Sequence, residues 1–190
     1  CMKYDNKMFE YKDVESERFF ALENIGKYSA KIKHIGEQVK DSIGIILIYS
    51  YYLDNGLIPV ALMLEELGYQ KHGGALLKSS SKSLGKYIII TSDPRYQSDR
   101  KLIEKVKAED NLRGEKIKIV LISMAGSEGV DFKNIRQIHI LDPWFNMSRI
   151  EQIIGRGVRT CSHKLLPFKE RNVQLFMYAS LLTDKPNEIA

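Results

Sequence analysis

Short apolar runs alternate along the chain with segments in which apolar residues recur every three or four positions. The runs are rich in Ile, Val and Leu and predict buried strands over 43–51, 87–91, 116–123, 137–141 and 172–179. The helical spacing predicts helices over 29–39, 60–67, 98–107 and 147–160. Short strands that alternate with helices are typical of a mainly parallel sheet covered on both faces, so we expect one doubly wound α/β domain.

This architecture indicates where ligand-binding residues should lie. In doubly wound sheets, ligands bind beyond the carboxyl ends of the strands. The residues at or just after those ends are Ser50, Thr91, Ser123 and Asp142. We therefore expect a functional edge of the sheet at these positions.

Two segments are less regular. Residues 1–24 mix Lys, Glu and Asp with aromatic residues, and we interpret them as an N-terminal extension or linker before a domain over 25–190. Residues 72–83 are rich in Gly, Ser and Lys and indicate a mobile loop, for which a plain solvated connection is the simpler reading. The chain starts at Cys1-Met2 and ends just after an apolar segment, so we expect it to be a piece of a larger protein.

Composition and charge exclude several classes of protein. The chain has 190 residues, 44% of them apolar and 28% charged, as in ordinary globular domains. The longest apolar run, 43–53, is broken by Gly44 and Ser50 and is shorter than the ~18 residues of a spanning helix, so no membrane partner is expected. Two cysteines, Cys1 and Cys161, and the lack of a secretory signal indicate a reducing, cytoplasmic compartment. The net charge of +5 is a weak indication of a polyanionic partner.

The sharpest motif is Gln152-x-x-Gly155-Arg156-x-x-Arg159, within the last predicted helix. Spacings of four and three place Gln152, Arg156 and Arg159 on one helical face, while the isoleucines between them can pack on the sheet. Two planar, permanently charged guanidiniums on a rigid support suit the charge that spreads over a transferring phosphoryl group. The simpler alternative is an amphipathic helix whose arginines only face water.

A second motif follows the third predicted strand, over 123–132. Gly126 and Gly129 permit a tight turn whose N–H groups can meet a phosphate or a nucleic-acid backbone. Asp131 can accept from a ribose hydroxyl or hold a neighbouring arginine. A glycine-rich turn alone is a weak signal, and it gains weight from its place shortly before the arginine motif.

Together these residues resemble a known family. Ser50 after an apolar strand, the segment 123–132 and the Gln152–Arg159 motif resemble motifs IV, V and VI of superfamily 2 helicases, in the second RecA-like domain. The resemblance covers about residues 25–180. The runs 138–146, 149–152, 159–163 and 166–173 further resemble helicases of large cytoplasmic DNA viruses, a group that includes the poxvirus early transcription factor small subunit, nucleoside triphosphate phosphohydrolase I, and asfarvirus and giant-virus relatives.

The resemblance implies that ATP and Mg²⁺ are bound chiefly by a first RecA-like domain, and that the second domain closes over the nucleotide. By this match, Arg159 is the arginine finger, and Arg156 is a second phosphate contact or positions the finger. Gln152 links to the nucleotide or to the first domain, and Gly129 and Asp131 border the ribose.

The resemblance also implies a nucleic-acid partner, with DNA expected. Ser50, Thr91, Ser123 and Met124 fall where the family touches the nucleic-acid backbone. Contacts of this kind carry no base information, so we expect weak sequence preference and a marked salt dependence. Viral transcription machinery is a further expected partner, and a viral protein of this group would act in the host cytoplasm and in the virion.

The departures from the family pattern limit what the chain does alone. It contains neither the phosphate loop G-x-x-x-x-G-K-[ST] nor an acidic Mg²⁺ box, so we expect catalysis only in the complete protein. There, an ATP-dependent helicase or translocase is the leading interpretation. One alternative is a nucleic-acid-stimulated ATPase that never separates strands, such as a transcription initiation or release factor. Another is a non-catalytic docking domain that uses the basic loop over 71–82.

Three remaining residues have simple interpretations. Cys161 and His163 supply two of the four ligands that a zinc site requires, so no metal site is expected. His139 lies inside a predicted strand. Trp144 could stack on a base or anchor the edge of the domain.

Overall fold

The computed structural model describes residues 2–12, 17–78, 83–126, 129–143 and 146–180. Its centre is a six-stranded sheet with the order β4-β5-β6-β3-β7-β8, in which every pairing is parallel. The strands are β3 (Ile45–Ser50), β4 (Tyr69–Lys71), β5 (Gly85–Ile90), β6 (Ile119–Ser123), β7 (Ile135–Ile140) and β8 (Gln174–Met177). The prediction of a doubly wound parallel sheet is confirmed.

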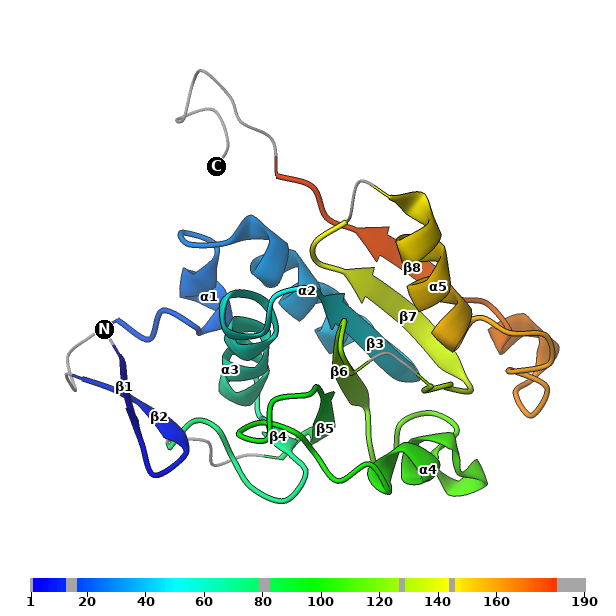
Figure 1. Ribbon diagram of the computed structural model, residues 1–190, viewed down its shortest axis with the longest axis horizontal. Helices are drawn as coiled ribbons and strands as arrows, with labels where there is room; N and C mark the ends of the chain where they lie inside the picture. The colour runs from blue at the N-terminus through cyan, green and yellow to red at the C-terminus, as the bar shows by residue number, and fades with distance from the viewer. Residues whose placement is uncertain (1, 13–16, 79–82, 127–128, 144–145, 181–190) are drawn as a thin grey trace.

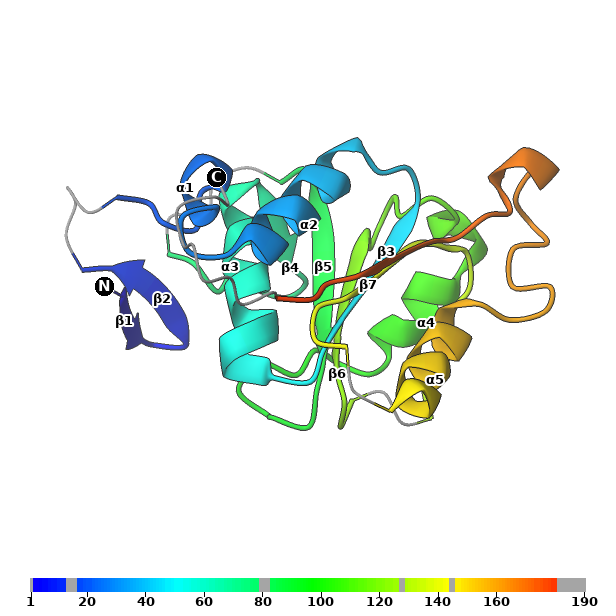
Figure 2. The same cartoon turned by 90° about the horizontal axis from the view of Figure 1, so that it is seen from above.

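Helices cover both faces of this sheet (Figure 1, Figure 2). One face carries α1 (Leu22–Ile25), α2 (Ala30–Asp41) and α3 (Ile58–Glu66), and the other carries α4 (Leu102–Lys107) and α5 (Met147–Gly157). A π-helical turn, η1 (Leu53–Leu57), joins β3 to α3. Two single 3₁₀ turns are η2 (Glu109–Asn111) and η3 (Phe168–Glu170).

The central strand explains why the apolar runs are continuous. Alternate residues of a strand point to opposite faces of the sheet. Ile46 and Ile48 pack under α2 and α3, while Ile45 and Leu47 pack under α4 and α5. All four side chains are fully buried. A strand covered on both faces therefore requires an apolar residue at every position, which is the pattern that the sequence shows.

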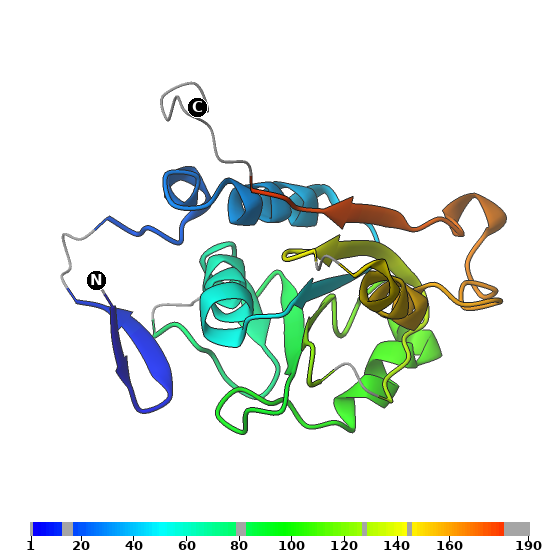
Figure 3. The ribbon, with the colours of Figure 1, turned by 45° about the horizontal axis from the view of Figure 1, so that its top comes forward.

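The N-terminal segment forms structure that the sequence pattern does not predict. β1 (Met2–Asp5) and β2 (Met8–Tyr11) make an antiparallel hairpin through a turn at Asn6 and Lys7, which both have positive φ. Phe9 N–H donates to Leu76 O at 2.6 Å, and Lys78 N–H donates to Phe9 O at 3.0 Å. The hairpin is thus tied to the loop after β4 and lies beside α3 (Figure 3). The domain boundary at residue 24 stays a prediction.

The loop predicted over 72–83 is partly anchored in the core. Leu76 and Leu77 are buried, and their N–H groups donate to the buried carboxylate of Glu65 at 2.9 and 2.5 Å. Tyr87 donates its hydroxyl to the same carboxylate at 2.7 Å. The prediction of a plain solvated connection is therefore wrong at these two leucines, and residues 79–82 lie outside the described residues.

Candidate functional site

The predicted arginine helix is present as α5, but it ends earlier than expected. Asn146 caps its start, because its Oδ1 accepts from Ser148 N–H at 2.9 Å. Ile150 and Ile153 bury the inner face of the helix in the core under β7. The helix stops at Gly157, not at residue 160.

Contacts with a distant segment explain this early end. The carbonyl of Arg156 would accept from residue 160 in a continuing helix, and it accepts instead from Phe132 N–H at 2.8 Å. Gly157 packs directly on β7, where an added Cβ would lie 3.1 Å from Ile138 Cδ1. Val158, the next residue, takes an extended backbone and is 45% exposed.

The early end changes how the motif is assembled. Gln152 and Arg156 lie on α5, whereas Arg159 lies beyond it, so the three do not share one helical face as predicted. Arg159 turns back, and its Nε donates to Gly155 O at 3.3 Å. Its Nη1 lies 2.7 Å from Oδ2 of Asp131, and Arg156 Nη1 lies 3.7 Å from Oδ1 of the same carboxylate. Asp131 therefore joins both arginines, which is one of the two roles expected for it.

The charges of this cluster favour an anionic ligand. Among the described residues, two guanidiniums share one carboxylate, so one positive charge is uncompensated there. The side chain of Arg159 is 52% exposed, and an ion pair at such a surface contributes only about 0–1 kcal/mol. A multiply charged phosphate can therefore displace Asp131 from Arg159. The cluster fits the phosphates of a nucleotide.

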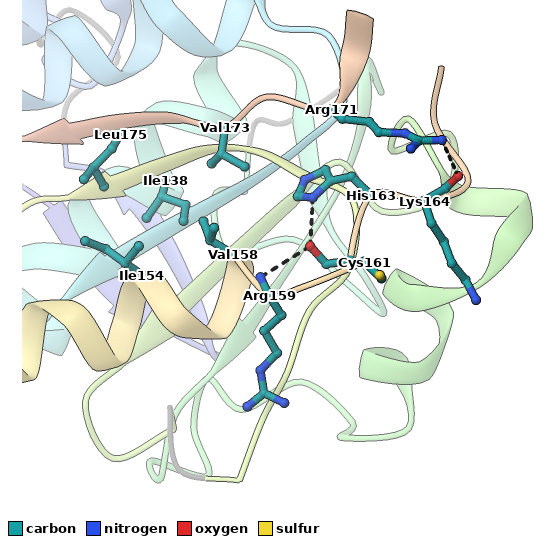
Figure 4. A pocket seen from close by; sticks show the side chains of 11 residues that line it. Ile138, Ile154, Val158, Arg159, Cys161, His163, Lys164, Arg171, Val173 and Leu175 are labelled. Carbon is teal, nitrogen blue, oxygen red and sulfur yellow. Dashed lines mark hydrogen bonds between the residues drawn. The ribbon is translucent and has the colours of Figure 1, made fainter. Parts of the chain in front are cut away.

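The backbone of Arg159 is held more firmly than its side chain. Its N–H donates to Ser162 Oγ at 3.4 Å, and Ser162 Oγ lies 2.8 Å from Nδ1 of His163. His163 Nε2 lies 2.6 Å from Ile135 O, so Nε2 carries the proton and Nδ1 accepts from the serine hydroxyl. Figure 4 shows the contacts of Arg159 N–H and His163 with the Ser162 hydroxyl beside a cavity of about 570 Å³, and the Arg159 guanidinium points away from the apolar side chains that line it.

At the carboxyl edge of the sheet, the structure brings the predicted hydroxyl residues together. Ser50 pairs with Ser123 in register, and the turn after Ser123 lies against the end of β5. An added Cβ on Gly126 would lie only 2.1 Å from Ile90 O and 2.8 Å from Thr91 N. This close approach explains why the turn contains glycine at this position.

The three hydroxyls are buried and engaged within the chain. Ser50 Oγ is hydrogen-bonded to the Asp142 carboxylate and accepts from Tyr52 N–H at 3.1 Å. Ser123 Oγ accepts from Gly126 N–H at 3.3 Å. These hydroxyls shape the loops at the edge, and their contact with nucleic acid stays a prediction.

Thr91, Met124 and Tyr52 lie at the same edge of the sheet. Thr91 N–H donates to Gln97 Oε1 at 2.7 Å, and Thr91 Oγ1 accepts from Asp93 N–H at 3.4 Å. Met124 is half-buried against the core under α4 and α5. Tyr52 is 53% exposed at the same edge.

Sequence reasoning missed an ion-pair cluster after β5. Arg95 donates to both carboxylate oxygens of Asp93, with Nη2 to Oδ2 at 2.6 Å, and its guanidinium lies 5.0 Å over the ring centre of Tyr96. The Arg95 guanidinium lowers the pKa of Asp93. The sequence Asp93-Pro94 indicates a turn after the strand, but it does not reveal which side chains contact one another there.

His139 is part of a hydrogen-bonded network. It is fully buried, and its ring is stacked on Phe176 with centres 4.6 Å apart. Its Nδ1 lies 2.8 Å from Tyr178 Oη, and its Nε2 lies 3.3 Å from Gln137 Oε1. Because Gln137 donates through Nε2 to Gln174, its oxygen accepts and His139 carries its proton on Nε2.

The remaining expectations concern metal ligands, membrane-spanning helices, Trp144 and Cys161. In that part of the chain, no three His, Cys, Asp or Glu side chains come together as metal ligands, and no helix is long and apolar enough to cross a membrane. Trp144 lies outside the described residues, so its interpretation stays open. Cys161 is exposed and free.

Comparisons with known proteins support the resemblance. Residues 75–161 match the helicase conserved C-terminal domain. The "Termination factor NPH-I homolog" of African swine fever virus (isolate Tick/Malawi/Lil 20-1/1983) is 30% identical over 214 residues, which cover 97% of this chain and 30% of that protein. A protein of Acanthamoeba polyphaga mimivirus, named for ATP-dependent RNA helicase activity, is 31% identical over 95% of this chain and 31% of its own length. The chain thus spans about a third of these relatives.

A solved structure confirms the fold. The C-terminal part of the Fun30 ATPase domain matches with a TM-score of 0.52 and 19% identity, over 82% of this chain and 45% of that one. The six-stranded parallel sheet with its helices is therefore RecA-like. The chain carries a helicase C-terminal domain, and over most of its length it is a distant homologue of the viral NPH-I homologs and of giant-virus helicases.

Proposed function

We propose that this chain is the second RecA-like domain of an ATP-dependent helicase or translocase that acts on nucleic acid during viral transcription. The observation that carries this proposal is the cluster of Arg156 and Arg159 around Asp131 at the end of α5. ATP and Mg²⁺ are bound chiefly by a first RecA-like domain, which supplies the phosphate loop. This chain supplies the arginines that complete the site.

In this mechanism, Arg159 is the arginine finger. When the two domains close, its guanidinium leaves Asp131 and contacts the transferring phosphoryl group, where it stabilises the developing charge. Arg156 is less exposed and acts as a second phosphate contact. Gln152 is exposed one turn earlier on α5 and links to the nucleotide or to the first domain. Gly129 and Asp131 border the ribose, and no atom of the described residues lies within 4 Å of the Cβ position on Gly129.

The carboxyl edge of the sheet is the proposed track for the nucleic-acid strand. Ser50, Thr91, Ser123 and Met124 gather there, in loops fixed by internal hydrogen bonds. We propose DNA as the strand and backbone contacts as the mode of binding, so that affinity falls as salt rises. Its resemblance to helicases of large cytoplasmic DNA viruses supports a location in the host cytoplasm and the virion, with viral transcription proteins as partners.

A second candidate function is a nucleic-acid-stimulated ATPase that does not unwind. The African swine fever virus relative is named as a termination factor homolog, which favours this alternative. A strand-displacement assay on a forked duplex separates the two, because only a helicase releases the shorter strand. The third interpretation, a docking domain without catalysis, leaves the shared carboxylate of the two arginines unexplained.

ATP hydrolysis by the complete protein tests the proposal. It is measured with and without single-stranded DNA, at low and at moderate salt. We expect DNA to raise turnover, and we expect the rise to fade as salt increases. A folded protein that binds DNA but hydrolyses no ATP under any condition would favour the docking interpretation.

A further inference from the structure

A pocket of about 470 Å³ lies between the N-terminal hairpin, the start of α3 and the loop after β5. Its lining includes five aromatic side chains: Tyr4, Phe9, Phe19, Phe20 and Tyr96. Ile58, Pro59 and Leu62 of α3 contribute aliphatic surface. The pocket therefore depends on the hairpin and on Phe19 and Phe20, all within the segment that we interpret from the sequence as an extension or linker.

Tyr4 contacts two other aromatic rings of this pocket and is itself partly exposed to solvent. The ring centre of Tyr4 lies 4.7 Å from that of Phe9 and 6.4 Å from that of Tyr96, with tilted planes in both pairs. Tyr96 is buried, whereas Tyr4 is 42% exposed. A supported and partly exposed ring of this kind can receive another flat ring.

The ionic groups at this pocket carry a net negative charge. Arg95 lies over the Tyr96 ring and donates to Asp93, and its Nη2 is 3.6 Å from Oδ2 of Asp54. Two carboxylates thus face one guanidinium, which makes the pocket unsuitable for a phosphate. An uncharged ring whose edge carries hydrogen-bond donors and acceptors suits both the aromatic walls and these polar groups. A nucleobase has this chemistry.

The pocket also lies beside the proposed nucleic-acid track. Asp54 lies four residues after Ser50 in the chain, and Arg95 lies four residues after Thr91. Asp93 N–H donates to Thr91 Oγ1 at 3.4 Å, so the Arg95 cluster is continuous with the edge of the sheet. A strand whose backbone follows that edge would have bases within reach of the hairpin, which lies beside α3 (Figure 1, Figure 3).

We propose that this pocket binds one unstacked base of the single strand, with Tyr4 as the stacking platform. The proposal rests on the proposed function, because it requires a strand at the carboxyl edge. Stacking tolerates every base, since each has a π-face, so the pocket would add affinity without sequence preference. It would also make residues 1–24 part of the nucleic-acid interface.

Binding of a fluorescent single-stranded DNA by the complete protein tests this site. Tyr4→Leu keeps apolar volume but removes the ring, and we expect it to weaken binding about 5- to 100-fold, the range for loss of one stacked base. Tyr4→Phe keeps the ring and should bind as the unaltered protein does. Phe168→Leu is the matched control, because Phe168 is 88% exposed on η3, at the opposite end of the molecule from the hairpin (Figure 1). Thermal unfolding confirms that each variant is folded.

A set of strands, each lacking one base, makes the test specific. The unaltered protein should lose affinity when one particular base is missing, and Tyr4→Leu should be insensitive to that loss. The proposal is overturned if Tyr4→Leu binds every strand as the unaltered protein does, the result expected if the pocket holds a side chain of another protein. It is also overturned if Tyr4→Leu keeps the full sensitivity to the missing base. Failure of the unaltered protein to bind any strand would instead reject the proposed function, and this site with it.

Discussion

At the residue scale, the central feature is one carboxylate shared by two arginines. Asp131 lies 2.7 Å from Arg159 and 3.7 Å from Arg156, and its buried Oδ1 has no hydrogen-bond partner among the residues that the structure describes. A contact so incompletely satisfied stabilises the fold little. Its effect is to hold the Arg159 side chain near the end of α5 until a stronger anion replaces the carboxylate.

Asp131→Asn separates the structural role of this contact from its functional role. We expect the free energy of unfolding to change by less than about 1 kcal/mol, because the pair is half-exposed. We expect ATP turnover by the complete protein to fall about tenfold or more, because the arginines lose their common partner. Chemical denaturation and steady-state hydrolysis check the two parts. Unchanged turnover with a large loss of stability would show that Asp131 has only a structural role.

Buried His139 predicts a pH dependence of stability. Burial, with a smaller contribution from the nearby His34, lowers the pKa of His139 from 6.5 to about 3. Below pH 6.5 the unfolded chain takes up a proton at this residue, and the folded chain does not until about pH 3. The folded state therefore loses stability as pH falls through this window, by up to about 1.4 kcal/mol per pH unit.

His139→Gln removes this dependence and provides the test. Urea denaturation at about pH 7 and about pH 5 should show that the unaltered protein loses about 2 kcal/mol more than the variant does over that interval. The comparison cancels the titration of groups that both proteins share. Equal losses in the two proteins would mean that His139 titrates in the folded state much as it does in the unfolded chain.

At the element scale, the sequence predicts the central strands and helices well because burial on both faces leaves a simple pattern. β4 and the β1–β2 hairpin are missed, since they are three or four residues long and mix polar with apolar side chains. The end of α5 is misplaced because Phe132 N–H, from a distant loop, takes the carbonyl of Arg156. Such ends depend on tertiary contacts that no local period encodes.

The turn after β6 gives a test at the same scale. We expect Gly126→Ala to destabilise the fold by about 3 kcal/mol or more, because the new Cβ would lie 2.1 Å from the Ile90 carbonyl and the backbone would have to move. Gly155→Ala is the matched control, since no atom of the described part of the chain lies within 4 Å of the Cβ position on Gly155. That helical substitution should raise stability by about 0.5–1 kcal/mol. Comparable unfolding midpoints for the two variants would contradict the close packing of this turn.

At the scale of the whole molecule, the two proposed functional regions lie apart. The hydroxyl residues lie at the carboxyl edge of the sheet, and the arginine cluster lies at the far end of α5, which begins near that edge. The motifs predict residues for both regions, because spacing and residue type are visible in the sequence. The partners of those residues could not be identified, since Ser50 and Asp142, for example, are 92 positions apart.

The most direct test of the account is Arg159→Ala in the complete protein, with ATP binding and ATP turnover measured on the same samples. Lys169→Ala is the control, since Lys169 is an exposed cation on η3, outside the arginine cluster. We predict that Arg159→Ala lowers turnover about 10³-fold or more while leaving nucleotide affinity within a few fold, because the finger acts mainly in the transition state. Turnover equal to that of the Lys169→Ala control would contradict the assignment of Arg159 as the arginine finger.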